Sequence, residues 1–126
     1  MPVMPGRRGH GRRPRDPHQR LVAAYRDAHS KLGIAYAHRP PLIARADSNE
    51  VRSFLVELTQ ANLSLRLLRA LCHTDVRYVL DRAFEEVDTA VRAPPSRGFY
   101  KDPEPWLLDA IEAVEEAARR DLQLEL

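Results

Sequence analysis

FLVELTQANLSLRLLRALC, residues 54–72, is the most apolar stretch of this sequence, and its spacing is that of an α-helix. Its apolar side chains recur in alternating steps of four and three residues, which places them along one face of a helix. Leu55 and Leu67 are expected to widen this apolar face. We therefore expect a central helix whose core positions are Phe54, Leu58, Ala61, Leu65, Leu68 and Cys72.

The residues just before this stretch carry a helix start signal. Asp47 stands three residues before Glu50, as in a capping box, although Asp replaces the usual Ser or Thr. In such a box the first side chain accepts a hydrogen bond from the amide three residues later, and the second returns to the first amide. We therefore expect Asp47 to cap the central helix.

An earlier helix is predicted between two proline signals. Asp16 followed by Pro17 has the form of a capping acid and a proline in the first turn. Pro40 and Pro41 end the helix, because neither ring can donate a backbone hydrogen bond. His29 lies beside the apolar face and is expected to be packed or hydrogen-bonded. The core positions of this first helix are Leu21, Tyr25, Ala28, Leu32 and Ala35.

A third helix is expected directly after the central one. Thr74 is its expected N-cap, and Asp75 in the first turn is favoured by the helix dipole. The connection is so short that it could be a tight turn or a kink within one long helix. The core positions are Val76, Leu80, Ala83, Val87 and Ala90, and Pro94-Pro95 ends the helix.

The last predicted helix is strongly acidic. It opens at Asp102-Pro103-Glu104, and its apolar positions are Leu107, Ile111, Val114 and Ala118. Residues 102–126 contain eight acidic side chains against Arg119 and Arg120, a net charge of −6. These carboxylates fall mostly opposite the apolar face, where charged side chains ordinarily contact solvent.

These four segments predict an all-α fold. The steps average 3.5 residues, a period typical of helices that pack nearly antiparallel. We expect residues 16–126 to form one domain, either a four-helix up-down bundle or a long helical hairpin with extra turns. No run of alternating β-branched or aromatic residues indicates a strand.

The first 15 residues differ from this body in composition. They contain no acidic residue and carry a charge of +5, whereas the whole chain carries +2, which leaves −3 for residues 16–126. Proline and glycine are frequent, and few apolar side chains are available for burial, so we expect a disordered arm. Guanidinium groups grip phosphate with two donors, so the arm is a candidate nucleic-acid-binding segment. Its arginines are Arg7, Arg8, Arg12, Arg13 and Arg15.

Composition and motifs exclude several other classes of protein. Cys72 is the only cysteine, so the chain forms no internal disulfide and no multi-cysteine metal site, and we expect this residue in the core. The sequence has neither a phosphate-binding glycine loop nor the histidine spacing of a helical metal site, so we expect no cofactor and no metal. It also lacks an apolar run of spanning length and the pattern of a secretory signal. These features predict a cytoplasmic protein with no membrane association and no small-molecule substrate.

Aromatic and basic residues gather before and within the start of the last helix. They could cap one end of the fold, or they could form a partner-binding patch, because Trp, Tyr and Arg often anchor interfaces. The patch consists of Arg97, Phe99, Tyr100, Lys101 and Trp106.

The sequence therefore predicts a non-enzymatic helical interaction or regulatory module that acts through protein–protein contacts, either with a partner or with itself. Apolar area left exposed after folding would supply the docking energy, at about 25 cal/mol per Å² buried before the costs of association. The alternative is a nucleic-acid-binding protein that uses the arm as an electrostatic clamp.

The hypothesis that the arm clamps nucleic acid makes a quantitative prediction. If five arginines neutralise five phosphates, the logarithm of the DNA affinity falls with the logarithm of salt concentration with a slope of about −4.5. A titration of labelled duplex DNA at several salt concentrations measures this slope, with a chain lacking residues 1–15 as the control. Equal binding by both chains, or no binding at low salt, would contradict the duplex-DNA version of the clamp.

Overall fold

The protein is all-α, as predicted. The computed structural model describes residues 16–93 and 102–126, and the predicted arm and most of the aromatic–basic patch lie outside these ranges. The described residues form four α-helices and one 3₁₀ turn. These are α2 (Pro17–Ala37), α3 (Asn49–Leu71), η2 (Thr74–Val76), α4 (Arg77–Arg92) and α5 (Glu104–Leu122).

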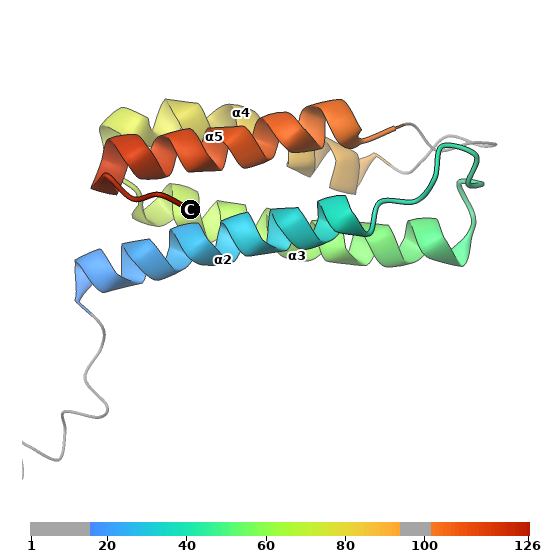
Figure 1. Cartoon of the computed structure of the whole chain (residues 1–126), viewed down its shortest axis with the longest axis horizontal. Helices are drawn as coiled ribbons and strands as arrows, with labels where there is room; N and C mark the ends of the chain where they lie inside the picture. Colours follow the sequence, from blue (N-terminus) through green and yellow to red (C-terminus); the bar gives the residue numbers. More distant parts are fainter. Residues whose placement is uncertain (1–15, 94–101) are drawn as a thin grey trace, which may run out of the picture.

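The helices lie side by side and alternate in direction along the chain (Figure 1). Helix α2 packs against α3 and α5, while α4 packs against the same two helices, so that each helix has two neighbours. In Figure 1, α2 and α3 form the lower layer and α4 and α5 the upper one. This arrangement is consistent with the four-helix up-down bundle expected from the apolar periodicity.

The core runs between the two layers and contains nearly every predicted position. All predicted core residues of the first two helices are buried, including Tyr25 and Cys72. Helix α3 contributes the most large buried side chains, but it is not central, because it has two neighbours like each of the other helices. The fully buried large aliphatic residues are Leu32, Leu58, Leu65, Leu68, Leu80, Leu107, Val51, Val87 and Val114.

The structure corrects the predicted core faces of α3 and α5. Leu67 was expected to widen the core face of α3, but its side chain is 55% exposed, because α3 contacts α2 and α4 through other faces. On α5 the buried face includes Ala110 and Ala117, whereas Ile111 is only partly buried. Helix α5 packs against both α2 and α4, and the small side chains of these two buried alanines suit a face between two helices.

Helices α3 and α4 are separate and joined by a tight turn. Cys72 and His73 both adopt extended backbone conformations, which interrupts the helical hydrogen bonding between them. The prediction that Thr74 caps the next helix is wrong. Thr74 opens the 3₁₀ turn, His73 precedes that turn, and no side chain there makes a capping hydrogen bond.

The start of α2 is as predicted, and the start of α3 is not. Asp16 Oδ1 accepts a hydrogen bond from the Gln19 amide at 2.8 Å. For α3 the N-cap is Ser48, whose Oγ accepts a hydrogen bond from the Val51 amide at 3.2 Å. Asp47 instead lies 3.4 Å from Arg45, so the expected Asp47–Glu50 capping box does not form.

Helix α5 ends in a left-handed residue that turns the chain back on the bundle. Gln123 has φ 55° and ψ 35°, and its amide donates to the carbonyl of Arg119 at 3.0 Å. The next amide, of Leu124, donates to the carbonyl of Ala118 at 3.2 Å, so the helix ends in an αL cap with one additional hydrogen bond. Leu124 then packs against the core. Across the described part of the chain, none of the helices combines the length and apolarity required to cross a bilayer.

The two candidate caps of α3 can be distinguished by substitution. Ser48→Ala removes the hydroxyl that accepts the Val51 amide, and we expect it to lower the free energy of unfolding by about 1 kcal/mol. Asp47→Ala removes only an exposed ion pair and is expected to change stability by less than about 0.5 kcal/mol. Urea denaturation followed by circular dichroism measures both values. A larger loss in Asp47→Ala than in Ser48→Ala would contradict the assignment of Ser48 as the cap.

Candidate interaction sites

The outer face of α3 carries a row of exposed aliphatic side chains. Val56, Leu63 and Leu67 are 61%, 57% and 55% exposed. They follow one another by seven and four residues, so they lie along one line of the helix, opposite the face that packs into the core. We call these three residues the α3 row. Single exposed aliphatic residues are common on protein surfaces, but three in one line form a continuous apolar strip.

The charged residues on both sides of the α3 row are turned toward neighbouring helices. On one side Glu57 lies 2.9 Å from the imidazole of His38, which follows α2. On the other side Arg66 lies 3.8 Å from Asp88 of α4, and its guanidinium is 5.8 Å from the centre of the Phe84 ring. The exposed residues between them on the row, such as Thr59 and Gln60, are uncharged. The strip therefore presents apolar and neutral polar groups to solvent.

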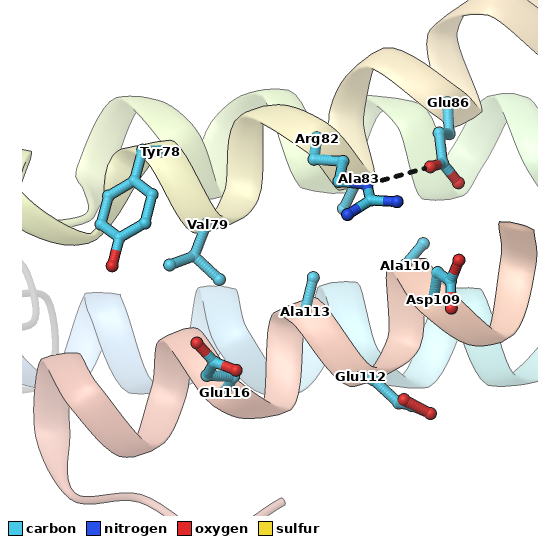
Figure 2. A pocket seen from close by; sticks show the side chains of 10 residues that line it. All are labelled: Tyr78, Val79, Arg82, Ala83, Glu86, Asp109, Ala110, Glu112, Ala113 and Glu116. Atoms are coloured by element: carbon cyan, nitrogen blue, oxygen red, sulfur yellow. Dashed lines mark ion pairs between the residues drawn. The ribbon is translucent and has the colours of Figure 1, made fainter.

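A second feature is a groove between α4 and α5, shown in Figure 2. Val79 and Ala113 point toward one another across it, and Ala83 and Ala110 complete an apolar floor. The rim is charged and mostly acidic. It consists of Arg82 and Glu86 on α4 and of Asp109, Glu112 and Glu116 on α5, with Tyr78 at one end.

The carboxylates of this groove are only partly neutralised. Glu86 lies 3.5 Å from Arg82, and Glu116 lies 3.0 Å from Arg120. The second oxygen of Glu86, Oε2, is buried and accepts no hydrogen bond from any described residue. Asp109 and Glu112 are exposed and form no ion pair with the residues that the structure describes. With Arg120 counted as the partner of Glu116, the rim retains a net charge of −2, from four carboxylates and two guanidinium groups.

A third cluster surrounds the buried carboxylate of Asp121, near the end of α5. Its side chain has 0% exposed surface. The hydroxyl of Tyr25 on α2 donates to Oδ2 at 2.8 Å, and the backbone amide of His73 donates to the same oxygen at 3.4 Å. The imidazole Nδ1 of His73 hydrogen-bonds the other oxygen, Oδ1. A single carboxylate thus joins α2, α5 and the α3–α4 turn.

The pKa values in this cluster follow from its burial and hydrogen bonds. Burial and the nearby Asp121 raise the pKa of the Tyr25 hydroxyl well above its usual range. The hydrogen bond that the protonated His73 imidazole donates to Asp121 raises the pKa of His73 above its ordinary value of 6.5. Burial raises the pKa of the Cys72 thiol, against a smaller opposite effect of Arg77. The Cys72 Sγ donates to the Arg69 carbonyl at 3.5 Å, as expected for a core cysteine.

This cluster resembles a carboxylate–imidazole pair of the kind that orients a catalytic histidine, but its chemistry differs. An activated cysteine nucleophile requires a lowered pKa, and that of Cys72 is raised. No group of three or more metal-ligating side chains gathers among residues 16–93 and 102–126. The hydrogen bonds of the cluster support a structural role, which fixes the turn between α3 and α4.

The sequence-predicted site residues fall almost entirely outside the described part of the chain. These are the arm residues Arg7, Arg8, Arg12, Arg13 and Arg15 and the patch residues Arg97, Phe99, Tyr100 and Lys101. The remaining patch residue, Trp106, lies in the first turn of α5, is partly buried and packs against the core. His29, expected to be packed or hydrogen-bonded, lies with its Nε2 2.9 Å from Glu115.

Sequence reasoning missed both the α3 row and the groove. The seven- and four-residue steps of Val56, Leu63 and Leu67 were visible, but Leu67 was assigned to the core face. The groove combines residues of α4 and α5 that are between 23 and 38 positions apart. No local pattern indicates which faces of two helices will meet.

Comparisons with known proteins yield no relatives: no family model matches this chain, and no curated protein or solved structure matches it with significance.

The raised pKa of His73 predicts that its stabilising contact depends on pH. The folded state keeps a proton on His73 above pH 6.5, where the unfolded chain loses it, so stability falls as pH rises through the folded pKa. Below the unfolded pKa the contribution is fully present. We expect the wild-type chain to lose stability relative to His73→Gln as pH increases from about 5.5 to about 8.5.

Urea denaturation of both chains across this range measures the difference. The comparison with His73→Gln removes the contributions of the other histidines, which the two chains share. A difference in unfolding free energy that stays constant over the range would show that His73 keeps its ordinary pKa in the folded protein.

Proposed function

We propose that the protein is a self-associating helical interaction module that acts by contact and catalyses no reaction. The observation that carries this proposal is the α3 row, three aliphatic side chains each more than half exposed along one line of a helix. An apolar strip of this kind loses contact with water when another helix packs on it, and the stabilisation is proportional to the area buried.

The best-fitting occupant of this strip is the same strip on a second copy of the chain. A two-fold symmetric contact places each patch against itself, so like charges within the patch would face each other. The α3 row avoids this cost, because Glu57 and Arg66 are engaged with His38 and Asp88 of their own chain. Two strips can therefore pack antiparallel without burying unpaired charges.

The dimensions of the row suggest a weak association. From Val56 to Leu67 the helix rises about 16 Å, so a pair of α3 helices makes a contact near the lower end of the range for specific interfaces. We therefore expect the monomer and the dimer to exchange at micromolar concentrations. Such an equilibrium suits a regulatory module whose assembly responds to its concentration.

The other functional hypotheses remain predictions. The nucleic-acid alternative depends on residues 1–15, which lie outside the described part of the chain. The patch of Arg97, Phe99, Tyr100 and Lys101 lies there as well, and location in the cytoplasm also stays a prediction. None of these hypotheses is supported by a feature of the described residues that is comparable with the α3 row.

The proposal predicts how the oligomeric state responds to substitution. Leu63→Glu places a charge in the middle of the strip, and we expect it to weaken the dimer at least about a hundredfold, equivalent to about 2.8 kcal/mol. Sedimentation equilibrium over a wide range of protein concentration measures the dissociation constant of each chain.

Ile43→Glu is the matched control, because Ile43 is 82% exposed but lies before α3 and outside the row. It should dimerise as the wild type does, and both variants should keep the wild-type circular dichroism spectrum. A wild-type chain that stays monomeric at the highest concentration, or an Ile43→Glu variant as weak as Leu63→Glu, would refute the proposal.

A further inference from the structure

The chain carries strong opposite charges on two of its segments. Residues 1–15 have a charge of +5, while the remaining 111 residues have a net charge of −3. The rim of the groove between α4 and α5 carries a net charge of −2 when Arg120, the partner of Glu116, is counted. A basic segment and an acidic groove in one molecule attract each other at a high effective concentration, because the chain connects them.

The groove has the features needed to bind arginine side chains. Its floor of Val79, Ala83, Ala110 and Ala113 is apolar, which suits the methylene stems of arginine. The lining also includes Asp109 and Glu112, exposed carboxylates without an ion pair among the described residues. A guanidinium group can bind a carboxylate through two parallel hydrogen bonds, which a lysine cannot do.

One further group in the groove favours a basic occupant. Glu86 Oε2 is buried and lacks a donor among the described residues, so a donor supplied by the occupant would relieve the cost of leaving it unbonded. Tyr78 is 62% exposed at one end of the groove (Figure 2), where its hydroxyl accepts a hydrogen bond from Arg120 at 2.6 Å, so this end already binds one guanidinium group.

The basic segment also begins close to the groove. Helix α2 starts at Pro17 and packs against α5, which forms one wall of the groove. The start of α2, the start of α4 and the end of α5 all lie at the same end of the molecule (Figure 1). Nine residues extend over about 30 Å, and a helix is about 10–12 Å across, so residues 7–15 can pass around α5 to the groove.

We propose that the groove between α4 and α5 binds the arginine-rich segment of the same chain, residues 7–15. The arginines pair with Asp109 and Glu112, and their stems cover the apolar floor. The bound segment is thereby withheld from other anions. This intramolecular contact is independent of the α3 row, and it weakens with salt because its charges remain near the surface.

Nuclear magnetic resonance of the full chain tests this contact directly. Three of the five glycines, Gly6, Gly9 and Gly11, lie in the N-terminal segment, and glycine amides are readily distinguished by their nitrogen shifts. In the wild-type chain we expect high salt to move the amide signals of Gly9 and Gly11 together with those of residues 109–116. In Asp109→Lys/Glu112→Lys we expect Gly9 and Gly11 to keep their high-salt positions at every salt concentration.

The matched control is Glu50→Lys/Asp75→Lys, which makes the same change of charge at two exposed acids away from the groove. This variant should behave as the wild type does. Unchanged signals of the core amides establish that each variant is folded. Equal Gly9 and Gly11 shifts in the groove variant and the wild type at low salt would overturn the proposal.

Dilution distinguishes contact within one chain from contact between two. The shifts of Gly9 and Gly11 should be independent of protein concentration if the segment binds its own groove. Shifts that revert on dilution would show that the segment binds a second copy, and would overturn the intramolecular assignment. Leu63→Glu, which removes the α3 contact, should leave the Gly9 and Gly11 shifts unchanged.

Discussion

The burial of the Asp121 carboxylate is the constraint on which the arrangement of the helices depends. A charged group without solvent contact is costly unless hydrogen bonds replace its hydration. The donors to Asp121 come from Tyr25 on α2 and from His73 in the α3–α4 turn, and the carboxylate itself lies on α5. Satisfying this single group therefore requires three distant segments of the chain to meet at one end of the fold.

This requirement also explains how the short α3–α4 connection is specified. The turn lacks a conventional cap, because no side chain bonds the first amides of η2 or α4. Asp121 on α5 accepts a hydrogen bond from the His73 amide, and the left-handed residue Gln123 ends α5 two positions after Asp121. Tertiary contact thus holds the residue before η2 in place, although no side-chain cap bonds the first amides of η2 or α4.

The distribution of charge determines which surfaces remain open. Glu57 and Arg66 are engaged by neighbouring helices, which leaves the strip between them uncharged. On the opposite layer, the carboxylates of α5 exceed the cations available to them, which leaves a groove with negative charge. The two surfaces therefore favour different occupants, an apolar helix on α3 and an arginine-rich segment between α4 and α5.

The sequence by itself determined the helical class, the position of each helix to within a few residues and most of the core. Those properties follow from periodicity and from local signals such as Asp16-Pro17, which act over one or two turns. Only the tertiary structure decided that Ser48 caps α3, that Leu67 faces solvent and that His73 meets Asp121, 48 residues later. These outcomes depend on which helix faces pack together, and that choice is made by contacts between segments that no local pattern connects.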